Sequence, residues 1–404
     1  MEDRLYDFWV ASLQDGYIGN LIDICERAGC ARDMYHMDED SLKEKLKLTD
    51  RLIAHIMGNR LGKDEIKRRY EDMERKGIKF IDYKEDCYPY RLKNIPSRPY
   101  ALFVLGKLPE ENRKSVAIVG ARECSEYGRL MAEYFGDRLA REGVDIISGM
   151  AWGIDGIAQM AAVQAGGNSY GILGCGVDII YPNRNKRLYE MLSENGNGLI
   201  SEYAPNTRAE AKHFPPRNRI ISGLCDILIV VEAKARSGTL ITVDMAADQG
   251  RTVMVVPGRV TDALSVGCLN LMNEGALPAV GVDSVLNQLE QINSISNSPI
   301  YKGRSEREDE RRERTNKRES ISDSKIVNRL RDKQTVPVKK MKRQPLSGDK
   351  VRIMDCLGLD PIGIDEIANR TGIAVASLMV IMTELEMDEY IREVGQMNFI
   401  ACFN

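Results

Sequence analysis

The chain has 404 residues, 43% of them hydrophobic, which is enough for two to four domains with sizeable cores. Its net charge is −3, no apolar run reaches 18 residues, and its start, MEDRLYDFWV, lacks a signal-peptide pattern. Nine scattered cysteines without a C-x-x-C pair, together with three histidines, disfavour both a disulfide framework and a metal centre. We therefore expect a cytoplasmic protein with no membrane segment and no bound metal.

Residues 1–76 have the pattern of a small helical domain. Apolar residues recur at helical spacing, as at Leu5, Phe8, Trp9 and Leu13. Helical bundles of this kind often bind DNA backbones or protein partners, but packing alone explains the pattern equally well. Both interpretations stay open for this part of the chain.

Residues 77–112 contain two strand patterns, GIKFIDY and ALFVL, separated by three X-Pro steps that favour extended backbone. From Ser115 to Val282, glycine turns and helical stretches separate six near-continuous apolar runs: SVAIV, VDIIS, SYGIL, GLISE, DILIVV and TVMVV. Such runs are typical of an α/β fold whose parallel sheet is covered by helices on both faces. We predict one sheet domain over residues 77–292, with its ligands at the carboxyl ends of the strands.

The turns after the first two of these runs do not have the pattern of a dinucleotide site. The first turn is explained equally well by anion binding and by a turn glycine followed by a solvated arginine. VGARECSEYG has Gly120 directly after the strand and the cation Arg122 on the turn, and Ser125 can cap the helix that follows. Because the turn is not G-x-G-x-x-G, the dinucleotide fingerprint is absent. In the next turn, SGMAWGID, Gly149 ends the strand, and we expect Asp155 to cap a helix rather than to catalyse a reaction.

The third turn, LGCGVDIIYPNRNKRLY, has Gly174 for a close backbone approach, followed by Arg184 and Lys186 on a predicted helix. Taken singly, these cations are equally well explained as a solvated helix face. Their position after a strand of the same sheet is what links them to the other cations.

Residues 213–239, HFPPRNRIISGLCDILIVVEAKARSGT, are the most informative stretch of the chain. Arg217 and Arg219 fall beside the start of one helix, and a buried strand then leads to Ser237 at the start of another. Helix N-termini bind anionic oxygens, and guanidinium groups bind phosphate well. Since no acid, histidine or cysteine stands where it could act on that phosphate, the stretch predicts a phosphate holder rather than a hydrolase.

Cations follow the ends of several strands of the predicted sheet: Arg122, Arg184, Lys186, Arg217, Arg219, Lys234 and Arg236. Those strand ends share one edge, so the charges converge on a groove suited to a polyanion with repeated phosphates. The chain has no G-x-x-x-x-G-K-[ST] motif and no ribose-binding acid after a dinucleotide fingerprint. We therefore predict no catalytic residue and no cofactor.

Residues 293–346 are rich in Ser, Asn, Arg, Glu and Lys, and we predict that they form a flexible tether. Within them, residues 297–346 carry 16 Lys and Arg against 8 Asp and Glu, a net charge of +8. Residues 347–404 then show a helix, a helix-turn-helix and a two-stranded hairpin, which is the order of a winged-helix domain. This last domain has 4 basic and 10 acidic residues, a net charge of −6, so we expect protein contacts or self-regulation rather than duplex binding.

The motifs GAR-x-x-S-x-x-G, GMA-x-GID, GCG-x-x-x-x-YP, ISEY, FP-x-RNR-IISGL, VVEA-x-x-x-SGTLIT and VPG occur in this order over residues 118–258. In this order they closely resemble those of the DNA-processing protein A family, also called DprA or Smf. The resemblance implies a Rossmann-like domain that binds single-stranded DNA without cutting it. It also implies a homodimer that protects incoming single strands and loads the RecA recombinase onto them during natural transformation. The predicted helical N-terminal domain, of the SAM or helix-hairpin-helix kind, and the predicted C-terminal winged helix also match domain arrangements seen in this family.

Carried over motif by motif, the resemblance places DNA at Gly120, Arg122, Arg217, Arg219 and Ser237. With the turn residues and cations above, the predicted DNA- and phosphate-binding set is Gly120, Arg122, Ser125, Gly149, Gly174, Arg184, Lys186, Arg217, Asn218, Arg219, Lys234, Ser237, Gly238 and Thr239.

The chain departs from the family pattern after GID, where the family commonly has a histidine in A-H-x-x-A and this sequence has Gln159. The change is further evidence against an enzyme. One alternative is nonetheless a nucleotide-processing enzyme, such as a nucleoside-monophosphate ribohydrolase, on a similar sheet. Those enzymes have P-G-G-x-G-T-x-x-E, whereas residues 237–242 here are followed by no such glutamate. A purely architectural partner-binding protein is a third possibility.

Overall fold

The computed structural model describes residues 2–14, 20–194, 196–296, 348–357, 362–387, 391–393 and 398–401. They belong to two compact units, one within residues 1–307 and the other within residues 308–404. The elements of the first unit are α1 (Glu2–Ser12), α2 (Leu21–Ala28), α3 (Ala31–His36), α4 (Glu39–Glu44), α5 (Asp50–Gly58), α6 (Lys63–Arg75), β1 (Ile78–Asp82), α7 (Tyr90–Lys93), β2 (Ala101–Gly106), β3 (Ser115–Val119), α8 (Glu126–Arg141), β4 (Asp145–Ser148), α9 (Ile154–Gln164), β5 (Ser169–Ile172), η1 (Asn183–Asn185), α10 (Lys186–Leu192), β6 (Gly198–Ser201), η2 (Ala211–His213), α11 (Phe214–Leu224), β7 (Ile227–Val230), α12 (Gly238–Asp248), β8 (Thr252–Val255), α13 (Val266–Asn273), β9 (Leu277–Pro278) and α14 (Val282–Ser296).

The first unit is built on a nine-stranded sheet with the strand order β1-β2-β6-β5-β4-β3-β7-β8-β9. Strands β3 to β9 are parallel to one another, which confirms the predicted parallel sheet. β2 pairs with β6 in the antiparallel direction, and β1 pairs with β2 in the same way. The two early strand patterns therefore lie along the larger sheet, as predicted.

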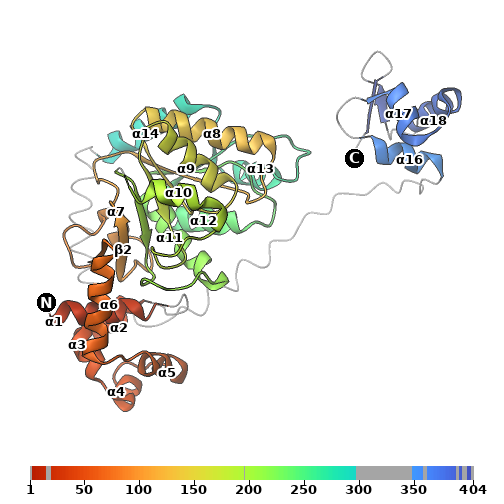
Figure 1. Ribbon diagram of the computed structural model, residues 1–404. Helices are drawn as coiled ribbons and strands as arrows, with labels where there is room; N and C mark the ends of the chain where they lie inside the picture. The colour runs from red at the N-terminus through yellow and green to blue at the C-terminus, as the bar shows by residue number, and fades with distance from the viewer. Residues whose placement is uncertain are drawn as a thin grey trace. The chain divides into compact units, whose positions relative to one another are not determined.

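Alternate residues of each strand face opposite layers of helices, as the period of two requires. On β3, Ala117 and Val119 pack in a cluster with residues of α11, α12 and α13. Val116 and Ile118 pack in the other cluster, with residues of α8, α9 and α14. Figure 1 shows α8, α9 and α14 gathered in this second layer.

The strand order reverses direction at β3. The chain passes from β3 through β4 and β5 to β6 on one side, and then returns to β7 and β8 on the other. The helices that connect β3 to β4 and β6 to β7 consequently cover opposite faces of the sheet. In open parallel sheets, ligands bind at such a reversal, outside the carboxyl ends of the two strands.

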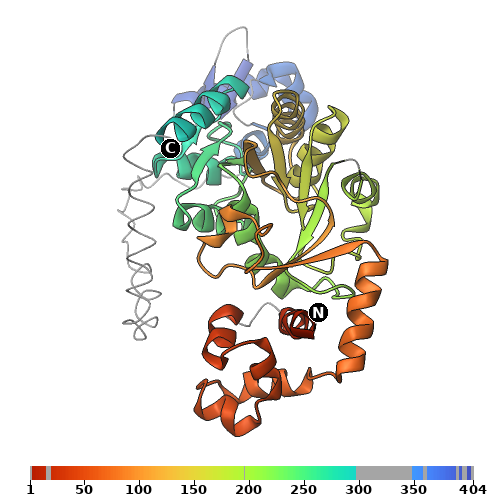
Figure 2. The ribbon, with the colours of Figure 1, turned by 90° about the vertical axis from the view of Figure 1, so that its left-hand side faces the viewer.

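The helices of residues 2–75 pack against the β1–β2 end of the sheet (Figure 2). Phe8 of α1 meets Phe80 and Phe103 edge-on, with ring centroids 5.7 and 6.0 Å apart. Arg4 donates to the Phe80 carbonyl oxygen at 2.7 Å. The predicted domain boundary after residue 76 thus falls inside one compact unit, and the independent folding of residues 1–76 stays a prediction.

The predicted tether begins later than its composition indicates, because α14 continues to Ser296. Val285, Leu289 and Ile292 of this helix pack in the cluster with α8 and α9, and the helix extends four residues beyond Ile292. The rest of the predicted tether, residues 297–346, lies outside the described residues.

The second unit has the winged-helix order that the sequence predicts. Its elements are α16 (Asp349–Cys356), β10 (Ile362–Gly363), α17 (Ile364–Thr371), α18 (Val375–Met387), β11 (Ile391–Glu393) and β12 (Asn398–Ala401). The strands form an antiparallel sheet in the order β10-β12-β11. Gly372 ends α17 with a φ of 69°, a left-handed conformation that suits glycine at this position.

Candidate functional site

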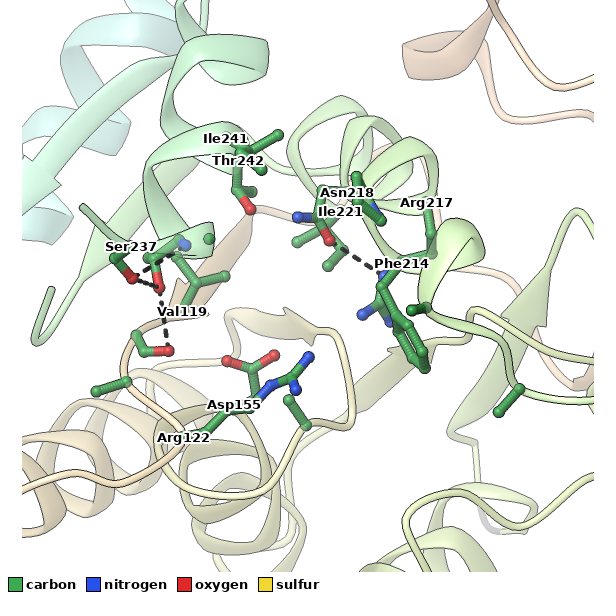
Figure 3. A pocket seen from close by; sticks show the side chains of 18 of the residues that line it. Val119, Arg122, Asp155, Phe214, Arg217, Asn218, Ile221, Ser237, Ile241 and Thr242 are labelled. Atoms are coloured by element: carbon green, nitrogen blue, oxygen red, sulfur yellow. Dashed lines mark hydrogen bonds between the residues drawn. The ribbon is translucent and has the colours of Figure 1, made fainter. Parts of the chain in front are cut away.

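A pocket of about 550 Å³ opens at the carboxyl ends of β3 and β7, where the strand order reverses. Its walls come from the turn after β3, the start of α9, the first turns of α11 and the start of α12 (Figure 3). The lining residues are Val119, Gly120, Ala121, Arg122, Ala151, Asp155, Tyr181, Ala209, Ala211, Phe214, Pro215, Arg217, Asn218, Ile221, Ser237, Gly238, Thr239, Ile241 and Thr242.

One wall is the N-terminus of α12, held against the turn after β3 by hydroxyl groups. The Ser237 side chain accepts a hydrogen bond from the Thr239 backbone N–H at 3.2 Å and donates one to Thr239 Oγ1 at 3.1 Å. Thr239 Oγ1 donates in turn to the Gly120 carbonyl oxygen at 3.2 Å. The positive end of the helix dipole is thereby directed into the pocket, where it favours an anion.

The turns after β3 and β4 touch, which is why glycine occupies both. A Cβ atom on Gly120 would lie 2.7 Å from Cγ1 of Ile154, and one on Gly153 would lie 2.2 Å from the Arg122 carbonyl oxygen. Gly153 also has a φ of 87°, which L side chains rarely adopt. This close approach sets the position of Arg122 at the pocket.

Arg217 forms the buried floor of the pocket. Its guanidinium donates to the Gly149 carbonyl oxygen at 2.8 Å and also to the Ile172 carbonyl oxygen. Its Nε donates to Oδ1 of Asn218 at 3.2 Å. Burial lowers the pKa of Arg217 to about 10, partly offset by the nearby Asp155. A buried cation of this kind is fixed by backbone oxygens before any ligand arrives.

Asp155 is the carboxylate that lines the pocket, and the prediction that it caps a helix is wrong. It lies in the first turn of α9, but the N-cap position is Gly153, without a side-chain cap bond. Its carboxylate instead accepts from the Gly149 backbone N–H at 3.1 Å. Burial raises its pKa, while Arg217 and hydrogen bonds act in the opposite direction. A Cβ on Gly149 would lie within 2.9 Å of both charged side chains, so glycine leaves room for them.

Arg122 is the exposed cation of the pocket. Its guanidinium lies 5.9 Å from the ring centroid of Phe214, and the Arg217 guanidinium lies 5.7 Å from the same centroid. Within the described residues, Arg122 has no ion pair. It points toward the centre of the cavity in Figure 3. Its charge is consequently available to an anionic ligand.

Arg219 does not line the pocket, contrary to the prediction. It donates to the two carboxylate oxygens of Glu202 at 2.7 and 2.6 Å and to the Ser97 carbonyl oxygen at 2.7 Å. Residues two apart on a helix are rotated by about 200°, so Arg217 and Arg219 face opposite sides of α11. Arg219 therefore anchors α11 to the end of β6.

Ser125 caps α8 as predicted, but it does so outside the pocket. Its hydroxyl accepts from the Gly128 N–H at 3.0 Å, and its own N–H donates to Glu232 at 2.9 Å.

The two predicted lysines also lie outside the pocket lining. Lys234 is exposed on the loop after β7 and is absent from the lining. Lys186 is exposed as well, and lies 3.8 Å from Glu190 on α10.

The pocket thus brings together half of the predicted residues: Gly120, Arg122, Arg217, Asn218, Ser237, Gly238 and Thr239. Gly149 and Gly174 line a smaller adjoining recess. Three lining residues that the sequence analysis does not select are Tyr181, Phe214 and Thr242. The dipeptides YP and FP in the family motifs contain Tyr181 and Phe214, and these two dipeptides are the sequence signal for both aromatic residues.

Gln159, which stands where the family commonly has histidine, is buried in a structural role. Its Oε1 accepts from the Met150 N–H at 3.1 Å, and its Nε2 donates to the Tyr170 carbonyl oxygen at 3.1 Å. The side chain therefore ties the turn after β4 to β5, outside the pocket lining.

Among the described residues, no group of three or more His, Cys, Asp and Glu side chains is placed to hold a metal ion. No helix in this described part of the chain has both the length and the apolar character that a membrane span needs.

The comparisons with known proteins agree with the motif order. Residues 79–290 match the family model of DNA recombination-mediator protein A, and residues 337–396 match that of the DprA winged helix domain. The chain is 44% identical over 206 residues to DNA processing protein DprA of Streptococcus pneumoniae. The matched region covers 51% of this chain and 72% of that protein. The chain is 35% identical over 246 residues to DNA processing protein DprA of Bacillus subtilis, covering 59% and 82% respectively. The X-ray structure of the Streptococcus pneumoniae protein has a TM-score of 0.61 and 33% identity, and covers 71% of this chain and 97% of that one.

Proposed function

This chain belongs to the DNA recombination-mediator protein A family, and on that premise we propose that it binds single-stranded DNA in the pocket at β3 and β7. The proposed role is to protect incoming single strands and to load the RecA recombinase onto them during natural transformation. The protein acts as a homodimer in the cytoplasm. The eight cysteines of the described residues are free thiols, which agrees with a reducing compartment.

The observation that carries this proposal is the exposed Arg122 guanidinium, which shares one pocket with the capped N-terminus of α12. A volume of about 550 Å³ falls in the range of small-molecule and cofactor sites, so the pocket accepts one nucleotide unit. Phosphate contacts of this kind provide affinity without reading bases. Binding with little sequence preference follows from them.

A mediator explains the pocket better than the nucleotide-processing enzyme does. Among the lining residues, Asp155 is the one carboxylate, and its Oδ2 already accepts the Gly149 N–H deep beside Arg217. Residues 237–242, at the start of α12, supply hydroxyl groups that bond to one another and to Gly120. These side chains hold the fold in place and bind an anion, which supports a role in holding DNA rather than cleaving it.

The test is fluorescence anisotropy with a labelled single strand and a duplex of the same sequence, at several salt concentrations. We expect the single strand to bind more tightly than the duplex. Arg122→Ala should lower the affinity and reduce the slope of log affinity against log salt by about one unit or slightly less. Arg141→Ala is the control, because Arg141 is paired with Asp137 at 2.8 Å at the far end of α8. Equal binding by wild type and Arg122→Ala would contradict the proposed site.

A further inference from the structure

Two large aromatic side chains are exposed at the same edge of the sheet as the pocket. Trp152, in the turn after β4, is 43% exposed, and Tyr181, in the loop after β5, is 44% exposed. An aromatic side chain that serves only in the core has a much smaller exposed fraction than these two. Exposed rings at a strand end can stack on a planar ligand with an apolar face.

Trp152 is held by a cation on one face. The Arg184 guanidinium lies over the indole ring, 5.2 Å from its centroid. Arg184 belongs to η1, and its predicted phosphate binding stays a prediction beside this contact with an aromatic ring. An indole in contact with a guanidinium on one face is oriented for a planar group on the other.

The aromatic residues surround a recess of about 90 Å³ that adjoins the pocket. Trp152, Tyr181 and Phe214 line it, and the rings of Tyr181 and Phe214 are 5.4 Å apart. The recess and the pocket share five lining residues: Arg122, Ala151, Tyr181, Phe214 and Arg217. A ligand with its phosphate at Arg122 can therefore reach the aromatic side chains directly.

The sheet order gives the direction of the path. From the pocket at β3 and β7, the next strands are β4, which precedes Trp152, and β5, which precedes Tyr181. Trp152 lines the recess and not the pocket, whereas Tyr181 lines both. The recess is therefore placed to receive a nucleotide next to the one in the pocket.

We infer that Trp152, supported by Arg184, forms with Tyr181 a stacking subsite for an unpaired base of the strand held in the pocket. The inference rests on the proposed binding of single-stranded DNA and adds a contact to the bases. Stacking on aromatic side chains accepts any base, because every base has a π face. The cations in the recess favour a nucleic acid over a protein as the occupant.

The test uses tryptophan fluorescence, because the chain has two tryptophans and the other is buried. Trp9 has no exposed surface and donates its Nε1–H to the Asn59 carbonyl oxygen at 2.9 Å. We expect an oligothymidylate to quench the fluorescence of the full-length protein. An abasic oligomer with the same number of phosphates should bind through the pocket without that quenching. Trp9→Phe should keep the quenching, and Trp152→Phe should lose it.

Affinities measured by anisotropy complete the test. Trp152→Ala should lower the affinity for oligothymidylate about tenfold, within the range measured for loss of base stacking, and leave the abasic oligomer unaffected. Trp152→Phe should restore most of that loss, since phenylalanine also stacks. Because Trp152 is 43% exposed, the melting temperatures of Trp152→Ala and Trp152→Phe should equal that of wild type.

The outcomes separate the two proposals. If neither oligomer binds, the proposed function is wrong and the subsite is wrong with it. If both bind, but oligothymidylate does not quench Trp152 and Trp152→Ala binds it as tightly as wild type, the stacking subsite alone is wrong. A Trp152→Ala variant that keeps both affinities but loses binding to RecA would make this surface a protein contact instead.

Discussion

At the scale of single residues, the two arginines of the pocket have different tasks. Arg217 is buried with its guanidinium against backbone oxygens, and Arg122 is exposed toward the cavity. Burying a cation is favourable only when its hydrogen bonds are satisfied, so Arg217 is part of the fold as much as of the site. The exposed Arg122 guanidinium is not needed in this way for the fold, and its charge is the one that an anionic ligand would neutralise.

We predict that Arg217→Ala lowers the free energy of unfolding by about 2–4 kcal/mol, because the Gly149 and Ile172 carbonyl groups lose their donor. Arg122→Ala should leave it unchanged within about 0.5 kcal/mol. Urea unfolding followed by circular dichroism compares the two variants. Equal stability of both would show that the buried hydrogen bonds of Arg217 contribute nothing to the fold. Loss of DNA binding in Arg217→Ala is consequently interpretable only beside its unfolding curve.

A second prediction concerns pH, through Asp155. Burial raises the pKa of this carboxyl, so it takes up a proton above the usual range of about 4. The ionised form repels a phosphate beside Arg122 and Arg217, and the protonated form does not. Affinity for single-stranded DNA should therefore rise as pH falls from neutral toward that range.

The matched control is Asp155→Asn, which keeps an oxygen for the Gly149 N–H but has no charge to titrate. Anisotropy titrations at several pH values should show a smaller rise in this variant than in wild type. The difference between the two curves isolates the contribution of Asp155 from that of other titrating groups. Parallel curves would exclude Asp155 as the titrating group.

At the scale of elements, two serines cap two helices of the same sheet edge with different consequences. Ser237 begins α12 inside the pocket, and Ser125 begins α8 outside it. Each offers a hydroxyl oxygen to a backbone N–H of the first turn. Only the first helix directs its N-terminus at the proposed phosphate.

We predict that Ser237→Ala destabilises the protein by about 1 kcal/mol, the usual effect of a lost N-cap. Ser125→Ala should destabilise it more, because the Ser125 hydroxyl also donates to the buried carboxylate of Glu232. Only Ser237→Ala should also weaken single-stranded DNA binding, because it loosens the wall that Thr239 holds against Gly120. Thermal unfolding and anisotropy on both variants decide the matter. A matching loss of affinity in Ser125→Ala would indicate a general effect of stability instead.

At the scale of the whole molecule, the charge is divided among the parts of the chain. Residues 297–346 have a net charge of +8 and residues 347–404 a net charge of −6. In the winged-helix unit, α18 has no lysine or arginine, and its Glu384 pairs with Lys350 at 2.8 Å. That helix is poorly suited to the phosphates of a duplex.

We predict that deleting residues 347–404 leaves single-stranded DNA binding largely intact. Deleting from residue 297 onward should weaken binding more at low salt than at high salt, since the long-range attraction of the net +8 is screened by salt. The second deletion starts at residue 297 because α14 extends to Ser296. Anisotropy on the full chain and both truncations measures this. If the first deletion abolishes binding, the DNA site does not lie in the sheet domain.

The sequence alone is sufficient to predict the sheet, its glycine turns, the winged-helix order and seven residues of the pocket. Those features depend on local patterns: the period of apolar residues, the positions of glycine and the caps at helix starts. The family also follows from the order of the motifs.

Only the tertiary structure decided which charges face the pocket. Arg217 and Arg219 are alike in the sequence, but their positions on α11 and the place of Glu202 direct one to the floor and the other into an ion pair. Asp155 and Trp152 belong to one short turn, and their roles depend on Arg217 and Arg184, which are far away in the chain. The direction of a side chain at a strand end depends on which residues of neighbouring turns contact it. Those residues are distant in the chain, so a local sequence pattern cannot identify them.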